Sequence, residues 1–216
     1  IILQFCQYER DLRYIQKKKV LYSHFHVEKF STFEHVRRTM KSGNLLILQS
    51  GIPSGVGNAV LYGMLSEALN YEDIEEVYGA YNGFEGILSE NFIDLAAIPQ
   101  KRANLLLSTE GYALKSESGD FCGNPEDFKK CIEVLSRKNI RFIAVIGSQE
   151  SIPCVKQLSQ AAQEKGYDLQ VLIVPQSNYN ELPTTDHSLG YGSYLKFLNS
   201  YMASFCNFLK SANISI

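Results

Sequence analysis

The sequence lacks the features that define several large classes of protein. Its five cysteines form no C-x-x-C pair, which argues against a zinc site or a disulfide-stapled framework and favours reduced thiols. No apolar run approaches the roughly 18 residues that span a membrane, and the opening Ile1–Leu3 is too short for a secretory signal. Neither sign of charge dominates, because 21 basic residues face 23 acidic ones. We therefore expect no membrane partner, no nucleic-acid partner and a cytoplasmic location.

What the sequence does contain is enough apolar material for a sizeable core, with 45% hydrophobic residues in 216. Short apolar runs predict strands at residues 45–48, 77–81, 104–107, 142–146 and 169–174. Apolar residues at helical spacing predict helices near residues 61–69, 128–135, 155–162 and 195–209. Asn124 followed by Pro125 is typical of a helix start, and Gly166 of a helix end. The alternation of strands and helices predicts an α/β fold with a doubly wound, mainly parallel sheet.

The first 43 residues do not follow this alternation. They predict an N-terminal helical arm, residues 1–43, ahead of an α/β domain at residues 44–216. Its basic cluster Lys17–Lys19 is either a patch for a partner or a solvated helix face, and we favour the second interpretation. His24 and His26 could share a metal ion, but no third ligand is suitably spaced, so we predict a surface or interface pair and no metal site.

Three polar segments follow predicted strands, at Ser50–Gly57, Gly147–Glu150 and Pro175–Asp186. Ligands of open α/β sheets bind beyond the carboxyl ends of the strands, where these segments would lie. The first segment is rich in glycine and precedes a helix, so its backbone N–H groups could approach an anion. It therefore predicts a phosphate-binding loop, although it fits neither the Rossmann fingerprint nor the Walker A pattern.

Taken together, the segments resemble the phosphofructokinase family of ATP- and pyrophosphate-dependent enzymes. Residues 50–59 (SGIPSGVGNA) are similar to the family's S-G-G-x-x-P-G-x-N-A loop. Residues 77–88 (VYGAYNGFEGIL) are similar to its V-Y-G-x-x-x-G-[YF]-x-G-L stretch. Matches to further family motifs follow in order at residues 109–115, 146–150, 174–183 and 185–191. The resemblance implies a three-layer, Rossmann-type sandwich corresponding to the family's N-terminal, nucleotide- or phosphate-binding half.

The resemblance also assigns site residues. It implies that nucleotide or phosphate contacts come from Gly51, Ser54, Gly55, Asn58, Lys115, Gly147, Ser148, Gln149 and Glu150. Lys115 would replace a phosphate-contacting arginine of the family. Tyr179 and Glu181 stand at the two positions of the family's catalytic T-I-D-x-D segment.

Several of these positions depart from the family pattern. Gln149 replaces the aspartate that organises Mg²⁺ in the family, and Tyr179 replaces the aspartate that acts as base on the sugar hydroxyl. An amide carries no charge to hold a cation, and a phenol is a poor base near neutral pH. Ile52 and Val56 replace loop glycines with β-branched residues. Glu181 keeps a carboxylate, and Glu150 matches an acidic variant found in pyrophosphate-dependent members.

Three functions remain open at this point. In the first, the chain is a phosphofructokinase-like domain that has lost catalysis and serves as a regulatory or structural subunit. Alternatively, it is an active 6-phosphofructokinase, using Mg²⁺ with ATP or pyrophosphate, whose site is completed by another segment or chain. A third alternative is a nucleotide- or phosphate-binding module that takes a phosphorylated small molecule. The chain is shorter than the family enzymes, whose second half supplies much of the sugar-phosphate site.

The final predicted helix carries a wide apolar stripe that includes Leu195, Leu198, Met202 and Phe205. One helix face packed on a sheet does not need so wide a stripe, and large exposed apolar patches usually mark partners. We therefore expect a homo- or hetero-oligomer, with an intact paralogue among the candidate partners.

Overall fold

The protein is described by a computed structural model that covers residues 42–117, 124–182 and 185–212. Almost all of the predicted N-terminal arm, with His24 and His26, lies outside the described residues. The described strands form one sheet in the order β3-β2-β1-β4-β5. They are β1 (Gly43–Ser50), β2 (Ile74–Ala80), β3 (Phe92–Asp94), β4 (Ile140–Gly147) and β5 (Gln170–Pro175). All neighbours pair in parallel except β2 and β3, which pair antiparallel.

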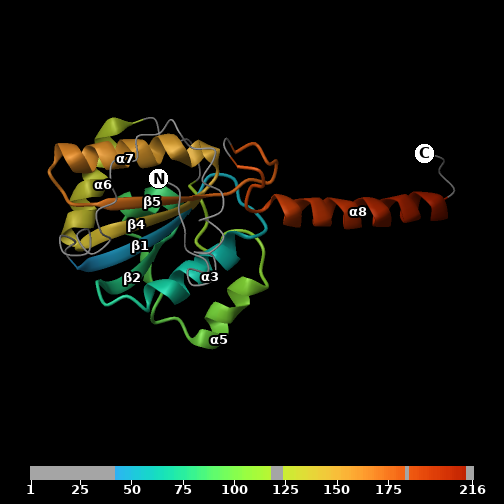
Figure 1. Ribbon diagram of the computed structural model, residues 1–216, viewed down its shortest axis with the longest axis horizontal. Helices are drawn as coiled ribbons and strands as arrows, with labels where there is room; N and C mark the ends of the chain where they lie inside the picture. Colours follow the sequence, from blue (N-terminus) through green and yellow to red (C-terminus); the bar gives the residue numbers. More distant parts are fainter. Residues whose placement is uncertain (1–41, 118–123, 183–184, 213–216) are drawn as a thin grey trace, which may run out of the picture. The chain divides into compact units, whose positions relative to one another are not determined.

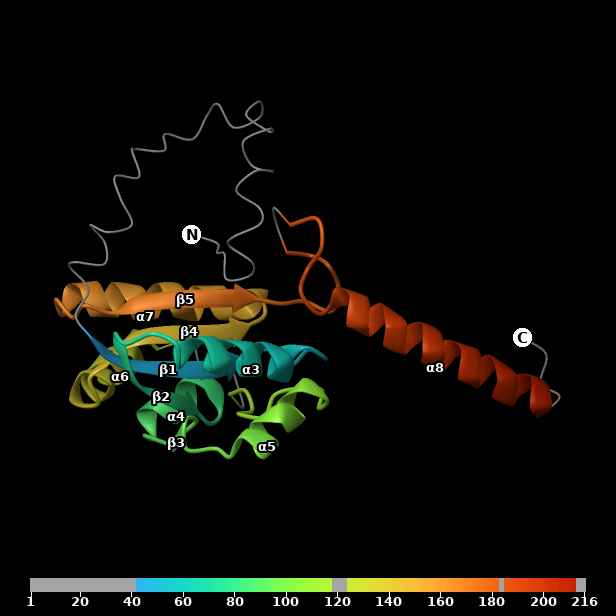
Figure 2. The ribbon, with the colours of Figure 1, turned by 60° about the horizontal axis from the view of Figure 1, so that its bottom comes forward.

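Helices cover both faces of this sheet, as Figures 1 and 2 show. One face is covered by α4 (Gly83–Leu88), α6 (Pro125–Arg137) and α7 (Ile152–Glu164). The other is covered by α3 (Gly57–Ala68). The short helix α5 (Gln100–Ala103) and the 3-10 helix η1 (Asn104–Leu107) come later in the chain, and η1 contacts α3. The predicted doubly wound α/β fold is therefore confirmed.

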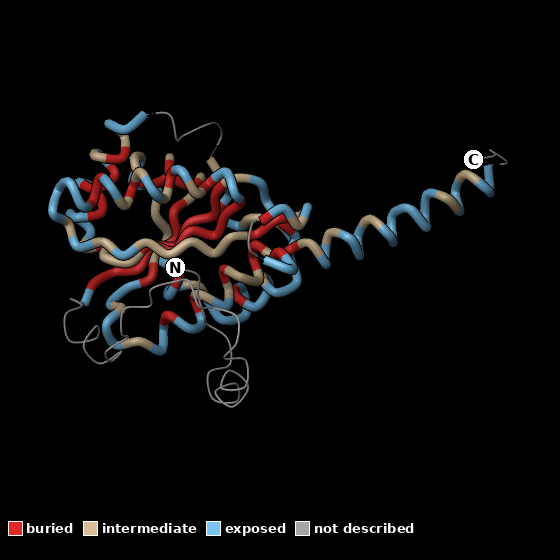
Figure 3. Tube along the Cα trace, turned by 45° about the horizontal axis from the view of Figure 1, so that its top comes forward, coloured by how far each residue is buried: buried red, intermediate tan, exposed pale blue. Residues whose placement is uncertain are grey.

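The central strand β1 shows why the sequence folds in this way. All eight of its residues are buried, because the sheet is covered on both faces (Figure 3). Leu46 and Leu48 enter the core beneath α6 and α7, whereas Leu45 and Ile47 enter the core beneath α3. A continuous apolar run is what a parallel strand with two buried faces requires.

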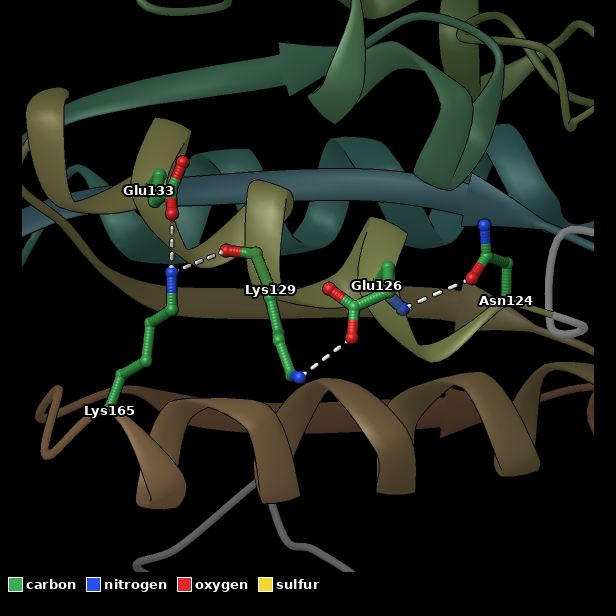
Figure 4. Close-up of polar contacts among 5 residues, drawn as sticks. All are labelled: Asn124, Glu126, Lys129, Glu133 and Lys165. Atoms are coloured by element: carbon green, nitrogen blue, oxygen red, sulfur yellow. Dashed lines mark hydrogen bonds and ion pairs between the residues drawn. The ribbon is translucent and has the colours of Figure 1, made fainter.

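Helix α6 begins where the sequence predicts. The Asn124 side chain accepts a hydrogen bond from the backbone N–H of Glu126 at 3.2 Å, and Pro125 occupies the first turn. Further along α6, Lys165 donates to Glu133 Oε1 at 2.7 Å and to the carbonyl of Lys129 at 3.0 Å (Figure 4). These bonds join the end of α7 to α6. The exposed Lys129–Glu126 pair adds little, because water screens the attraction between exposed charges.

Two sequence-based predictions are wrong, and one strand was missed. Residues 104–107, predicted as a strand, form η1, in which Leu105 and Leu107 are exposed and Leu106 packs against the α3 core. A four-residue apolar run has no periodicity that separates a strand from one helical turn. The three-residue strand β3 was not predicted, since it is too short to show alternation. Of the described cysteines, Cys154 is disulfide-bonded, which contradicts the prediction of reduced thiols, whereas Cys131 and Cys206 are free, as predicted.

Helix α8 (Tyr191–Ser211) follows the predicted boundaries, but none of its residues is buried (Figure 3). Its first turn contacts the segment that precedes it: Tyr194 packs edge-on against Tyr179, and Tyr191 against His187. Beyond this turn, the rings of Phe197, Tyr201 and Phe205 stack along the exposed surface. The stripe is therefore not part of a core among the described residues. Within that part of the chain, no helix is both long and apolar enough to cross a membrane.

Candidate functional site

The three predicted polar segments meet at the carboxyl edge of the sheet. Ser50 at the end of β1 lies opposite Gly147 at the end of β4, and Gly147 lies opposite Pro175 at the end of β5. The segments that follow these three residues therefore begin side by side. Cross-links hold them together: the Asn178 side chain donates to the carbonyl of Pro53 at 3.2 Å, and Gln176 N–H to the carbonyl of Gly147 at 2.9 Å.

The glycine-rich loop between β1 and α3 has most of its backbone donors engaged. Gly51, at φ 71°, donates its N–H to Glu117 Oε1 at 3.0 Å. The next N–H, of Ile52, is directed at Ser148 Oγ at 3.3 Å. Further along, the Val56 N–H lies 3.4 Å from Ser54 Oγ, and the Gly57 N–H bonds the Ser54 carbonyl at 3.3 Å. The loop is thus closed by the protein's own side chains and backbone.

Glu117 occupies the base of this loop. Its Oε1 also accepts a hydrogen bond from Ser50 Oγ at 2.6 Å, and Ser50 Oγ in turn accepts one from Ser151 at 2.8 Å. Ser50 and Ser151 are both buried. Buried hydroxyls that donate to a carboxylate make strong, charge-assisted hydrogen bonds, so this chain of three side chains fixes the carboxylate in place.

A second network ties the loop to the segment after β5. The buried Ser54 hydroxyl bonds Gln176 Oε1, and Gln176 Nε2 donates to Tyr112 Oη at 2.8 Å. Tyr112 Oη lies 3.2 Å from the carbonyl of Ile52 and donates toward it. Burial raises the pKa of Tyr112, an effect that the Gln176 hydrogen bond partly offsets. The phenol therefore stays neutral, and its hydrogen bonds with Gln176 and Ile52 link the segment after β5 to the loop.

Two residues predicted to contact phosphate have distinct surroundings. Asn58, at the start of α3, is buried, and its side chain binds the chain near residues 109–113 through Thr109, Glu110 and Ala113. Its amide thereby positions Tyr112 rather than pointing at solvent. Lys115 is exposed and has a left-handed backbone, with φ 60°. The remaining predicted contacts divide by exposure: Ser54, Gly147 and Ser148 are buried, and Gly55, Gln149 and Glu150 are exposed.

The two predicted catalytic residues lie in the segment after β5. Tyr179 is 62% exposed, and its ring packs against Tyr194 with centroids 5.8 Å apart. Glu181 is exposed, and its Oε2 accepts a hydrogen bond from Ser177. Glu150 Oε2 similarly accepts one from Ser148 at 3.0 Å. Among the described residues, no group of three His, Cys, Asp or Glu side chains is placed to share a metal ion.

This geometry defines a class of protein. The class is the doubly wound α/β domains with a glycine-rich loop between the central strand and the following helix, an architecture in which ligand sites lie at this edge of the sheet. The comparisons identify the family within that class. Residues 44–213 match the Phosphofructokinase family, and the chain belongs to it.

The similar proteins include both donor types. The pyrophosphate–fructose 6-phosphate 1-phosphotransferase of Rhodospirillum rubrum is 30% identical over 162 residues, which are 74% of this chain and 39% of that protein. An ATP-dependent 6-phosphofructokinase of Oceanobacillus iheyensis is 29% identical over 154 residues, 69% of this chain and 43% of that protein. The solved pyrophosphate-dependent phosphofructokinase of Marinobacter aquaeolei superposes with a TM-score of 0.70 at 29% identity, covering 80% of this chain and 42% of that one. The chain therefore spans about two fifths of these relatives.

Sequence reasoning did not find three residues that organise this site: Glu117, Tyr112 and Gln176. Their roles depend on contacts between segments that are far apart in the chain, and the local spacing of residues does not predict such contacts. The sequence holds only weak signals for them: Tyr112 and Gln176 lie inside segments that match family motifs, 109–115 and 174–183, and Glu117 lies two residues after the first of these.

Proposed function

We propose that this chain is a phosphofructokinase-family domain that does not transfer phosphoryl groups by itself and serves as a regulatory or structural subunit. The observation that carries the proposal is the pair of neutral side chains, Gln149 and Tyr179, at the two central chemical positions. Both lie at the carboxyl edge of the sheet, and both are exposed.

Phosphoryl transfer depends on positioned cations and on a group that accepts the proton of the attacking hydroxyl. The Gln149 amide has no charge with which to hold Mg²⁺. Tyr179 presents a phenol, and its ring is engaged with Tyr194. Glu181 is the remaining carboxylate of that segment, and one of its oxygens is already bonded to Ser177. These residues do not fit a bound Mg²⁺–donor complex.

The role as a subunit is supported by α8. Leu195, Tyr201, Met202 and Phe208 are each more than two fifths exposed, on a helix that contacts the domain through its first turn. An apolar surface of this kind is typical of a contact between proteins. We propose that it binds a second phosphofructokinase-family chain, either a copy of this one or an intact paralogue, in the cytoplasm.

A coupled assay of the full chain with fructose 6-phosphate, Mg²⁺ and either ATP or pyrophosphate tests the loss of catalysis. The expected rate equals that of a reaction without the protein, whereas the Rhodospirillum rubrum relative, as a positive control, turns over pyrophosphate. Turnover that rises in proportion to the concentration of this chain contradicts the proposal.

The second candidate function is a pyrophosphate-dependent phosphotransferase whose site is completed by another segment or chain. It is favoured by the retained carboxylates of Glu150 and Glu181 and by the pyrophosphate-dependent relatives at about 30% identity. The same assay separates the two functions when it is repeated with the chain bound to its partner. Turnover with pyrophosphate that is lost in Glu181→Gln supports the second candidate.

A further inference from the structure

The loop predicted to cradle a phosphate already holds an anion that the chain itself supplies. The Glu117 carboxylate accepts the Gly51 N–H at 3.0 Å and the Ser50 hydroxyl at 2.6 Å, the two donors nearest the carboxyl end of β1. We propose that Glu117 is a built-in anion that excludes phosphate from this loop, so that the site rejects ligands that would place a phosphate group there.

The position of the carboxylate is fixed from several sides. Ser151 donates to Ser50, and Ser50 donates to Glu117, so two buried hydroxyls are aligned toward Oε1. On the other side lies Gly83, at φ 57°, where a Cβ would overlap Glu117 Oε2. Only a glycine leaves room for this oxygen, and its positive φ independently favours glycine. The surroundings are therefore built around the carboxylate.

The second carboxylate oxygen of Glu117 determines the electrostatics of the loop. Glu117 Oε2 is buried and has no hydrogen-bond partner among the described residues. In that part of the chain no ion pair involves Glu117 either. A phosphate bound at the Gly51 N–H would therefore face an adjacent like charge that no described side chain neutralises, and like charges in a partly buried site repel strongly.

The neighbouring donor is also engaged. The Ile52 N–H is directed at Ser148 Oγ, and the Ser148 hydroxyl donates to Glu150 Oε2 at 3.0 Å. Because Pro53 has no N–H, the first three residues of the loop offer no unengaged backbone donor. To bind there, a phosphate must displace Glu117 from Gly51 and Ser148 from Ile52. The exclusion therefore combines occupied donors with charge repulsion.

This inference rests on the proposed function, since it concerns the ligand of the same site, but its test measures binding instead of turnover. The full chain and its Glu117→Ala variant are titrated calorimetrically with pyrophosphate and, separately, with inorganic phosphate. We expect the variant to bind pyrophosphate at least about tenfold more tightly than the parent, because the Gly51 and Ser50 donors become available. Glu110→Ala, an exposed carboxylate in the same segment, is the matched control and should bind as the parent does.

A second measurement locates the binding. The backbone amide resonance of Gly51 should shift when pyrophosphate is added to Glu117→Ala and stay unchanged when it is added to the parent. If Glu117→Ala does not fold, as judged by circular dichroism, Glu117→Gln removes the charge while keeping an acceptor for Gly51, and it should also bind more tightly than the parent. Equal affinity of parent and variant, or a Gly51 shift in the parent, overturns the inference. Neither result bears on turnover, so the proposed loss of catalysis would be judged separately.

Discussion

At the scale of single residues, Cys131 shows how burial changes the chemistry of a side chain. It lies fully buried in α6 beside Phe128 and Leu135, and burial raises the pKa of its thiol to about 12 from 9.0. Between these values the folded protein retains a proton that the unfolded chain releases. The free energy of unfolding should therefore fall as pH rises through this range, by up to about 1.4 kcal/mol per pH unit.

Urea denaturation at several pH values above about 8 measures this slope. The Cys131→Ala variant removes the titrating thiol and should show a shallower decrease. A thiol reagent provides an independent check at constant pH: Cys206, which is partly exposed, should react in the folded protein, and Cys131 only after unfolding. A Cys131 that reacts as fast as Cys206 in the folded protein contradicts the prediction.

Single residues with a local role were predictable from the sequence, and those with a distant partner were not. The cap at Asn124 and the left-handed Gly166 depend on their immediate neighbours, and both are confirmed. Gln149 and Tyr179 were identified by their places in motifs. The role of Glu117 was not predicted, because charge and residue type alone do not distinguish it from other glutamates. It follows from the contacts of Glu117 with Ser50 and Gly51 in the structure.

At the scale of elements, the buried strands were the most predictable part of the fold. β1 and β4 are nearly continuous apolar runs, as a sheet covered on both faces requires. Short segments were not predictable, since η1 and β3 hold too few residues for a pattern. The stripe of α8 was predicted correctly, but the spacing within the helix does not show that none of its residues is buried.

We expect a charge within the α8 stripe to weaken association. Met202, 51% exposed, neighbours Phe205 on the same face, and Met202→Glu would place a carboxylate in a contact that otherwise buries apolar surface. Light scattering should show the association constant reduced by roughly tenfold or more.

Ser200→Glu is the matched control, because Ser200 is exposed on the opposite side of the same helix and its substitution adds the same charge. It should leave the association unchanged. A parent protein that stays at the monomer mass of 24.4 kDa at micromolar concentration would remove the support for a subunit role.

At the scale of the whole molecule, family membership and the neutral side chains Gln149 and Tyr179 point in different directions. Residues 44–213 match the phosphofructokinase family, and the fold superposes on a solved member with a TM-score of 0.70. At the carboxyl edge, however, Glu117, Ser148 and Ser54 are hydrogen-bonded to other groups of the chain. The fold was predictable because its signals are spread over the whole chain, whereas the state of the site depends on a few contacts.

Restoring the two neutral positions should therefore not restore activity. In Gln149→Asp combined with Tyr179→Asp, the loop is still filled by Glu117, and the chain still covers only 39% of the Rhodospirillum rubrum relative. The coupled assay with fructose 6-phosphate should show the same rate for the double variant and the parent. A rate above that of the parent would mean that these two side chains alone limit the chemistry.

The central place of β1 also affects how this domain can fold while it is being synthesised. β1 is the first of the described strands to be synthesised and can pair with β2 soon afterwards, but its other edge must wait for β4, which follows only after α6. During that interval an apolar strand exposes one unpaired edge, the feature most prone to nonspecific association in a nascent chain. Pauses in translation between β2 and β4 are therefore the moments at which a chaperone matters most to this domain.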